Sequence, residues 1–290
     1  MLKIVRNYCQ LLRLQHYLKN SLIFIPLFFS QNFFNISCLL ASLAGFCCFS
    51  LTASLIYIIN DMRDIAKDRQ HKTKRLRPLA SGAISVKQAA NVLVILIIVL
   101  GVLLLTLQDH IGSKATTTLF LYLFLNIGYS YGLKNIPIVE ILILASGFIL
   151  RIIFGAYVVN VDISIWLYLT VIMGALYLGF GKRRNELQKN TRKVLNYYTY
   201  NFLDKNMYMC QILFIVFYSL WSIDSTTIAR FHTAAFSYTV PILFLILMKY
   251  NLNLERGSDG DPIPIILHDK ILLALCGVYS LTAFYLVYFL

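Results

Sequence analysis

The residues with the clearest chemical potential lie in one acidic segment, NDMRDIAKD at positions 60–68. Asp61, Asp64 and Asp68 follow at helical spacing, and with Asn60 they fall on one helix face within roughly 100°. Such close carboxylates repel one another unless a cation lies among them. Oxygen ligands suit a hard ion such as Mg²⁺, which also bridges substrate phosphates. The segment therefore predicts a magnesium site, with an exposed helix end that is salt-bridged to neighbouring Arg and Lys as the alternative.

A basic segment follows directly at positions 69–77 and leads into Pro78-Leu79-Ala80-Ser81-Gly82. A diphosphate bound beside a carboxylate–metal site needs cations, because the metal covers only some of its oxygens. Lys74, Arg75 and Arg77 are candidates for this role. Membrane topology or contact with anionic lipid explains the number of charges. Neither explains why a proline and a glycine shape the loop.

A second polar cluster has the same spacing as the first. Lys182, Arg183 and Glu186 repeat the i, i+1, i+4 pattern, but this cluster is mainly basic. A metal–phosphate group between the two clusters would meet complementary charge; a plain basic flank of a membrane span is the alternative. Glu140 and Arg151 fall within apolar stretches, where a charged residue faces a cavity or is satisfied by a neighbouring helix.

The rest of the sequence is that of an integral membrane protein. Of 290 residues, 59% are hydrophobic and 13% charged, and mean hydropathy is +0.70; soluble domains carry about 25% charged residues. Uncharged runs of about 20 residues fit membrane-spanning helices and are too long for barrel strands. The sequence predicts an all-α polytopic protein with about nine transmembrane helices. The expected spans are 14–30, 38–60, 87–107, 114–133, 138–158, 163–181, 207–224, 232–249 and 271–290.

The basic residues predict the orientation of these spans. Net charge is +13, which in a soluble protein would suggest nucleic acid, but here it fits the positive-inside rule and no nucleic-acid partner is expected. All Lys and Arg other than Lys114, Arg151 and Arg230 fall on one side of the predicted spans. We expect a multi-pass protein of the cytoplasmic (inner) membrane. Its N-terminus and active-site loops would be cytoplasmic and its C-terminus outside.

The acidic signature, followed by RPLASG at 77–82, resembles the first motif of the UbiA superfamily of intramembrane prenyltransferases. The resemblance covers essentially the whole chain. It implies one transmembrane domain over 1–290, with helices ringed around a central cavity that opens to lipid. In that cavity such proteins bind a diphosphate complexed with Mg²⁺.

One departure from the superfamily pattern points to a particular branch. Typical members carry a second Asp-rich motif after the sixth span, whereas this chain has GKRRNEL at 181–187. This segment, QHYLKN at 15–20 and YGLK at 131–134 resemble the decaprenyl-phosphate phosphoribosyltransferases. The resemblance implies transfer of 5-phosphoribose from 5-phosphoribosyl 1-diphosphate to a polyprenyl phosphate, with release of diphosphate.

The resemblance also suggests roles for individual residues. Asp61, Asp64 and Asp68, assisted by Asn60, would hold Mg²⁺ and act in catalysis. The remaining substrate contacts would come from Lys74, Arg75 and Arg77 on the diphosphate, Lys182 and Arg183 on a second phosphate, Glu186 on these cations or a ribose hydroxyl, Lys19 and Lys134 on the lipid phosphate, and Tyr131 as a further substrate-binding residue.

Two other functions remain open at this point. The same fold could transfer a prenyl chain from a prenyl diphosphate to an aromatic or quinone-precursor acceptor, although the second carboxylate motif of such enzymes is lacking. A non-catalytic transporter or lipid carrier is the other alternative. The expected partners are the phosphorylated sugar donor, the polyprenyl phosphate and the bilayer, and a homo-oligomer is left open.

Overall fold

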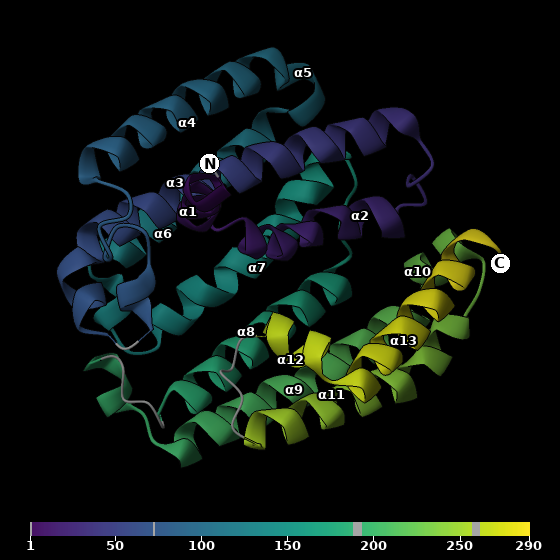
Figure 1. Cartoon of the computed structure of the whole chain (residues 1–290). Coiled ribbons are helices and arrows are strands. Elements are labelled where there is room, and N and C mark those ends of the chain that lie inside the picture. Colours follow the sequence, from purple (N-terminus) through teal and green to yellow (C-terminus); the bar gives the residue numbers. More distant parts are fainter. Residues whose placement is uncertain (1, 72, 188–192, 257–261) are drawn as a thin grey trace. The chain divides into compact units, whose positions relative to one another are not determined.

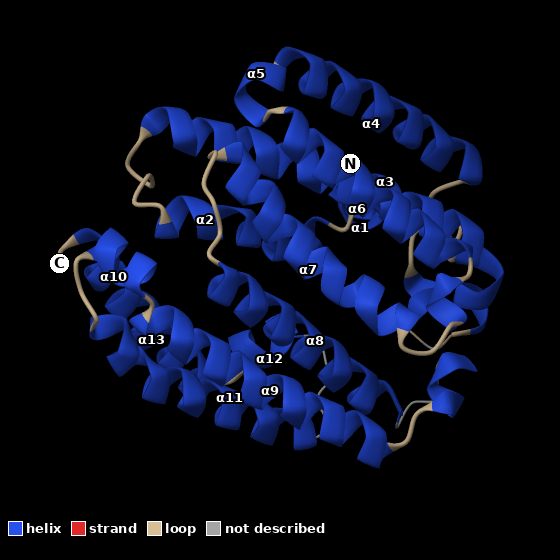
Figure 2. Ribbon diagram, turned by 180° about the vertical axis from the view of Figure 1, so that it is seen from behind, coloured by secondary structure: helices blue, strands red, loops and turns tan. Residues whose placement is uncertain are grey.

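The computed structural model describes residues 2–71, 73–187, 193–256 and 262–290 (Figure 1). Every regular element in these ranges is a helix (Figure 2), which confirms the all-α prediction. Seven of the described helical segments are long and apolar enough to cross a membrane, so the chain is a multi-pass membrane protein. They are α3 (Ile36–Gln70), α4 (Val86–Thr106), α7 (Val139–Val158), α8 (Ile165–Leu187), α9 (Tyr200–Ile223), η5 with α11 (Ala235–Glu255) and α13 (Lys270–Tyr288).

The predicted count of nine spans is not confirmed. The first expected span, 14–30, is divided into a 3-10 helix, η1 (Leu14–Ile23), and a short α2 (Phe24–Phe29). Pro26 has no N–H to continue an α-helical ladder from the preceding turn. The fourth expected span is α6 (Ser113–Tyr131), whose Lys, Thr, Asn and Tyr side chains lower its mean hydropathy.

The chain divides into two compact units, which are described separately. Unit 1 comprises Met1–Leu133 and Leu150–Val161, and unit 2 comprises Lys134–Ile149 and Asp162–Leu290. Helix α7 therefore contributes its first half to unit 2 and its second half to unit 1. The expectation of a single domain over 1–290 stays a prediction. The remaining elements of unit 1 are α1 (Leu2–Leu12), η2 (Lys74–Leu76) and α5 (Gln108–Ile111).

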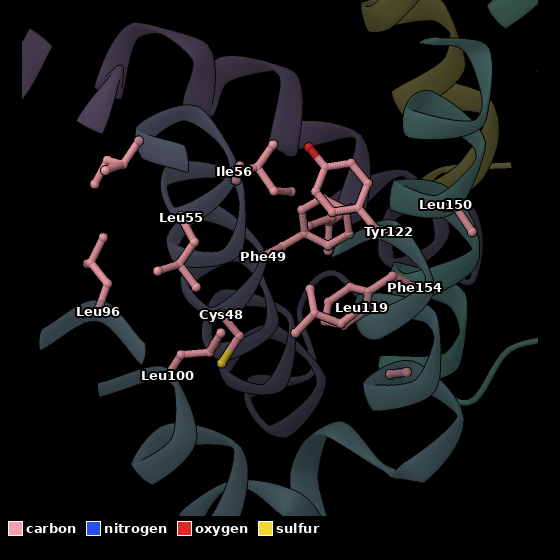
Figure 3. Packing of buried hydrophobic residues seen from close by; sticks show 14 of the residues in the cluster. Cys48, Phe49, Leu55, Ile56, Leu96, Leu100, Leu119, Tyr122, Leu150 and Phe154 are labelled. Carbon is pink, nitrogen blue, oxygen red and sulfur yellow. The ribbon is translucent and has the colours of Figure 1, made fainter. Parts of the chain in front are cut away.

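The core of unit 1 forms around the apolar half of α3, which packs against α4 and α6. The Phe49 ring lies 4.5 Å from that of Tyr122 and 5.3 Å from that of Phe154, and Leu96 and Leu100 of α4 point toward α3 (Figure 3). Between membrane-spanning helices, such side chains stabilise the fold mainly through van der Waals packing, because lipid tails are as apolar as the core. This packing holds the apolar half of α3 in place, and the polar end of the same helix continues from it.

Helix α3 is longer than the predicted span. It begins at the Asn35 cap, whose side chain accepts hydrogen bonds from Ser37 N and Cys38 N, and it continues to Gln70. The acidic segment is therefore a direct continuation of the helix, as the sequence predicted. After a loop, α4 starts at a capping box formed by Ser85 and Gln88, a standard way to fix a helix start.

Unit 2 is built on α8 and α9, which pack along each other. Gly174 allows this approach, because a methyl group there would lie 2.9 Å from the Phe214 ring. Asp269 caps α13 by accepting a hydrogen bond from Leu272 N, 2.8 Å away. The other elements assigned to unit 2 are η4 (Lys193–Tyr197), α10 (Ser225–Phe231), η5 (Ala235–Thr239), α11 (Val240–Glu255) and α12 (Pro262–His268), while η3 (Leu133–Asn135) starts at the boundary.

Candidate active site

Two carboxylates of the acidic segment converge on one cation in unit 1. Arg77 Nη1 lies 3.1 Å from Asp61 Oδ1 and 2.7 Å from Asp68 Oδ2. Both aspartates are buried, at 3% and 4% exposure. Because a single guanidinium nitrogen touches both, the two carboxylates face the same point although they are seven residues apart. The structure thus brings together two of the three acids that the sequence singled out.

Arg13 reaches the same site from the N-terminal segment. Its Nη2 lies 2.5 Å from Asp61 Oδ1, and its guanidinium stacks over the Tyr57 ring at 4.6 Å. Its backbone, at φ 53 and ψ 49, is in the left-handed region, which costs a non-glycine residue about 1–2 kcal/mol. Sequence reasoning missed Arg13, because no local spacing links it to a partner 48 positions away.

The other acidic-segment residues connect α3 to α6. Ser130 Oγ donates to Asn60 Oδ1 at 3.2 Å, and Arg63 Nη1 donates to the Ser130 carbonyl at 2.7 Å. The Arg63 guanidinium also lies 4.2 Å from the centre of the Tyr131 ring, which is 66% exposed. Asp64 is half-buried on the same helix. These contacts hold the predicted Asn60 and Tyr131 at one end of unit 1.

The loop after α3 has the defined shape that its Pro and Gly suggested. Arg69 Nε donates to the Ala80 carbonyl at 3.1 Å, and Ile84 N donates to the Pro78 carbonyl at 3.1 Å. Gly82 has φ +77, a conformation that glycine adopts without steric cost. The loop therefore holds Arg77 in place at the end of η2.

The other basic residues of this loop lie around a histidine turn. His71 Nδ1 accepts the backbone N–H groups of Thr73 (3.3 Å) and Lys74 (3.4 Å). Partial burial and the nearby Lys74 charge lower the pKa of His71, which keeps the ring neutral and able to accept. The Lys74 side chain is half-buried and that of Arg75 is exposed. Lys72, also in the basic run, lies outside the described residues.

The acidic site fits a cation that brings further oxygen ligands. Among the residues that the structure describes, no three His, Cys, Asp or Glu side chains gather as a preformed metal site would. Two carboxylates do converge, however, and Mg²⁺ commonly takes one or two carboxylates from a protein while substrate phosphates and waters complete its shell. The donors are oxygens, as a hard ion prefers. Asp61 and Asp68 are the residues that would hold it.

The second cluster, in unit 2, is a closed ionic group. Arg183 Nε lies 2.7 and 2.6 Å from the two Glu140 oxygens, and Arg183 Nη1 pairs with Glu186. Arg183 and Glu140 are both 0% exposed, while the Glu186 side chain is 14% exposed. Tyr198 OH donates to Glu140 at 3.4 Å and accepts from Ile138 N at 2.6 Å; burial raises the pKa of this phenol. Glu140 is therefore satisfied by a neighbouring helix.

Arg151, the other charged residue within an apolar stretch, is also satisfied by neighbouring side chains in unit 1. Its Nε donates to Asn20 Oδ1 at 2.8 Å and its Nη2 to Tyr122 OH at 3.2 Å. Asn20 in turn donates to Ser50 Oγ at 2.8 Å. This network ties the predicted Lys19-Asn20 motif to α3, α6 and α7, and leaves Lys19 half-buried beside it.

Two predicted phosphate ligands remain, both in unit 2. Lys182 follows the apolar part of α8 and is half-buried, and Lys134, in η3, is also half-buried. The neighbouring Arg184 pairs with Asp204 at 2.5 Å. Lys182 and Lys134 thus have less enclosed side chains than Arg183.

Comparison with known proteins identifies the class. The sequence profile of the UbiA prenyltransferase family matches residues 22–263. Decaprenyl-phosphate phosphoribosyltransferase from Corynebacterium glutamicum is 31% identical over 245 residues, which cover 82% of this chain and 73% of that protein. The enzyme of the same name from Mycobacterium tuberculosis is 31% identical over 249 residues, 82% of this chain and 80% of that protein.

A solved structure agrees at the level of the fold. A UbiA homologue from Archaeoglobus fulgidus bound to DMAPP and Mg²⁺ has a TM-score of 0.70 at 15% identity, over 98% of this chain and 100% of that one. The chain therefore belongs to the UbiA prenyltransferase family. It is a multi-pass membrane transferase, which agrees with the enzyme prediction and not with the transporter alternative.

Proposed function

We propose that this enzyme transfers 5-phosphoribose from 5-phosphoribosyl 1-diphosphate to a polyprenyl phosphate and releases diphosphate, with Mg²⁺ as cofactor. The observation that carries the proposal is the pair of buried carboxylates, Asp61 and Asp68, facing one point beside two arginines. The relatives named decaprenyl-phosphate phosphoribosyltransferase support the choice of donor and acceptor. The segment GKRRNEL at 181–187, which stands where typical members carry a second Asp-rich motif, supports it against prenyl transfer.

The residues of unit 1 would act on the leaving group. Asp61 and Asp68, with Asp64 and Asn60 from the same helix end, would hold Mg²⁺. When bound, the ion would neutralise part of the diphosphate charge and polarise its bond to C1. Arg77 and Arg13 already reach the carboxylates that would hold the ion, so their N–H groups can donate to diphosphate oxygens next to it. Lys74 and Arg75 would cover the outer oxygens.

The reaction needs positioning more than activation of a nucleophile. The C1–O bond to diphosphate breaks and a C1–O bond to the lipid phosphate forms. A phosphate monoester is already an anion at neutral pH, so no general base is required. Stabilisation of the departing diphosphate and alignment of the two reactants supply the catalysis.

The remaining assignments follow from the sequence. Lys182 would bind the C5 phosphate, Lys19 and Lys134 would bind the lipid phosphate, and Tyr131 would be a further substrate contact. We assign Arg183 to holding Glu186, because its guanidinium is enclosed between two carboxylates. We also propose an inner-membrane location with the N-terminus and the charged loops on the cytoplasmic side.

A product assay tests the proposal against the alternative chemistry. Purified enzyme with Mg²⁺ is offered phosphoribosyl diphosphate and a polyprenyl phosphate, or a prenyl diphosphate and an aromatic acid. Mass spectrometry should detect a polyprenyl-phosphate phosphoribose in the first reaction. A prenylated aromatic product, with no phosphoribosylated lipid, would contradict the proposal.

A further inference from the structure

The acidic site contains its own counter-ions. Asp61 and Asp68 contribute two negative charges, and Arg13 and Arg77 contribute two positive charges within 3.1 Å of their oxygens. These four side chains therefore sum to zero formal charge. A bare divalent cation that entered this group would leave it with a charge of +2, or +1 when Asp64 joins as a third ligand, in a place where the Asp61 and Asp68 carboxylates are buried. Uncompensated charge is costly away from bulk water.

Arg77 and a metal ion also compete for the same place. Arg77 Nη1 lies where oxygens of Asp61 and Asp68 converge, which is the point that a bridging ion would occupy. Two cations cannot share it, so the ion can enter only when the guanidinium moves away. Charge-assisted hydrogen bonds of this kind are stronger than those between neutral groups, and a bare ion must overcome their loss.

A diphosphate removes both obstacles. Its oxygens can accept the N–H groups that Arg77 and Arg13 withdraw from the carboxylates, and arginine suits this exchange because its planar fork matches carboxylate and phosphate alike. Its negative charge also offsets that of the ion. Arg77 and Arg13 are able to shift, because their side chains are 27% and 16% exposed.

We propose that Arg77 is the internal cation of this site, which bridges Asp61 and Asp68 until a metal–diphosphate complex displaces it. The inference rests on the proposed function for its metal site. It goes further by predicting that metal and diphosphate bind with strong positive coupling, and that Arg77 is the source of that coupling. By linkage, the coupling acts equally on both ligands.

The test uses Mn²⁺ as the metal and inorganic diphosphate as the second ligand. Protein-bound Mn²⁺ is measured by electron paramagnetic resonance after rapid separation, for the full-length enzyme in detergent. Wild type should bind Mn²⁺ weakly alone and about 30-fold more tightly with diphosphate. In Arg77→Gln, affinity for Mn²⁺ alone should rise about tenfold, and the gain from diphosphate should shrink by a similar factor.

Lys67→Gln is the matched control, because it removes one positive charge from the exposed side of the same helix end. It should leave Mn²⁺ affinity within about twofold of wild type. Arg13→Gln provides a second variant, in which Mn²⁺ affinity should rise less than in Arg77→Gln because Arg13 touches one carboxylate rather than two. Thermal unfolding confirms that each variant is folded.

The outcomes separate the two proposals. If Arg77→Gln and Arg13→Gln bind Mn²⁺ no more tightly than Lys67→Gln, or if wild type binds Mn²⁺ equally well without diphosphate, the inference is wrong and the metal site stands. If neither wild type nor Arg77→Gln binds Mn²⁺ even with diphosphate, the metal assignment in the proposed function is wrong, and the inference with it.

Discussion

The polar ends of α3 and α8 carry opposite versions of one arrangement. At the end of α3, a buried acid, Asp61, lies between two arginines. At the end of α8, a buried arginine, Arg183, lies between two glutamates. The arginines around Asp61 are 16% and 27% exposed, whereas Glu140 is 0% and Glu186 14% exposed. The first group can exchange partners with a ligand, and the second is built to stay closed.

This difference separates a reacting centre from a supporting one. Removing a partner from a closed buried ion pair leaves an uncompensated charge and costs mainly stability. In the α3 group the arginines are partly exposed. Removing its central acid should therefore mainly weaken binding of the ligand. The predictions that follow test this separation.

The largest effect is expected at the centre of the α3 group. Asp61→Asn keeps the shape of the side chain but removes the charge that would hold the metal. Turnover should fall by about a thousandfold, while the fold should lose less stability than in Arg183→Gln, because Arg77 keeps its contact with Asp68. Asp109→Asn removes an exposed acid from α5 and should retain wild-type turnover, measured for both variants as radiolabelled donor converted to lipid product. Equal activity in the two variants would contradict the metal assignment.

The α8 group should show the opposite profile. Arg183→Gln leaves Glu140 buried without its counter-ion and should destabilise the fold by about 3–5 kcal/mol. Glu186→Gln keeps the enclosed Arg183–Glu140 pair and should cost less than about 1 kcal/mol. Denaturation in mild detergent measures both. A stable Arg183→Gln variant that fails to bind the donor would instead favour the original expectation that Arg183 is a phosphate ligand.

Arg13 sharpens the comparison, because it carries both an ion pair and a strained backbone. Arg13→Gln and Arg13→Gly should each lower turnover about tenfold, since both lose the contact with Asp61. The glycine variant should be more stable than the glutamine variant by about 1 kcal/mol, because glycine adopts a positive φ without strain. Steady-state kinetics measures the effect of losing the ion pair, and thermal unfolding measures the effect of the backbone conformation. Equal stability of the two variants would show that the backbone at Arg13 carries no strain.

The smallest effect is expected from pH through His71. Its pKa lies below the ordinary 6.5, so the neutral ring is favoured in the folded loop. The neutral ring's contribution to the stability of the loop is complete above pH 6.5. It is lost as pH falls through the lowered folded-state pKa of His71. Donor binding should weaken about threefold over that range. His71→Asn keeps a side-chain acceptor that does not titrate, so its binding should lose this part of the pH dependence.

Much of the α3 site could be predicted from sequence because its signals are local. Helical spacing places Asp61 and Asp68 on one face, and Pro78 and Gly82 mark the loop that carries Arg77 back to them. The contact from Arg13 could not be predicted in this way. It joins residues far apart in sequence, and the left-handed turn that aims it has no glycine or asparagine to mark it.

The α8 group was only half predictable. The spacing of Arg183 and Glu186 suggests a pair on one helix. Spacing does not reveal burial, however, and a basic triplet at a helix end normally faces water. A signal was present in Glu140, an acid at the start of one predicted span, because such a residue needs a partner. The count of nine spans stays a prediction, because the apolar runs near 14–30 and 114–133 correspond to a 3-10 helix with a short α2 and to a less hydrophobic α6, which are not among the seven candidate spans of the described residues.

The most direct test of the account is a structure of the enzyme with Mn²⁺ and phosphoribosyl diphosphate, in which anomalous scattering locates the metal. We predict an ion at about 2.0–2.3 Å from oxygens of Asp61 and Asp68, with the Arg77 guanidinium moved onto the diphosphate. A metal bound away from both aspartates, or a bound donor with Arg77 still bridging them, would contradict it.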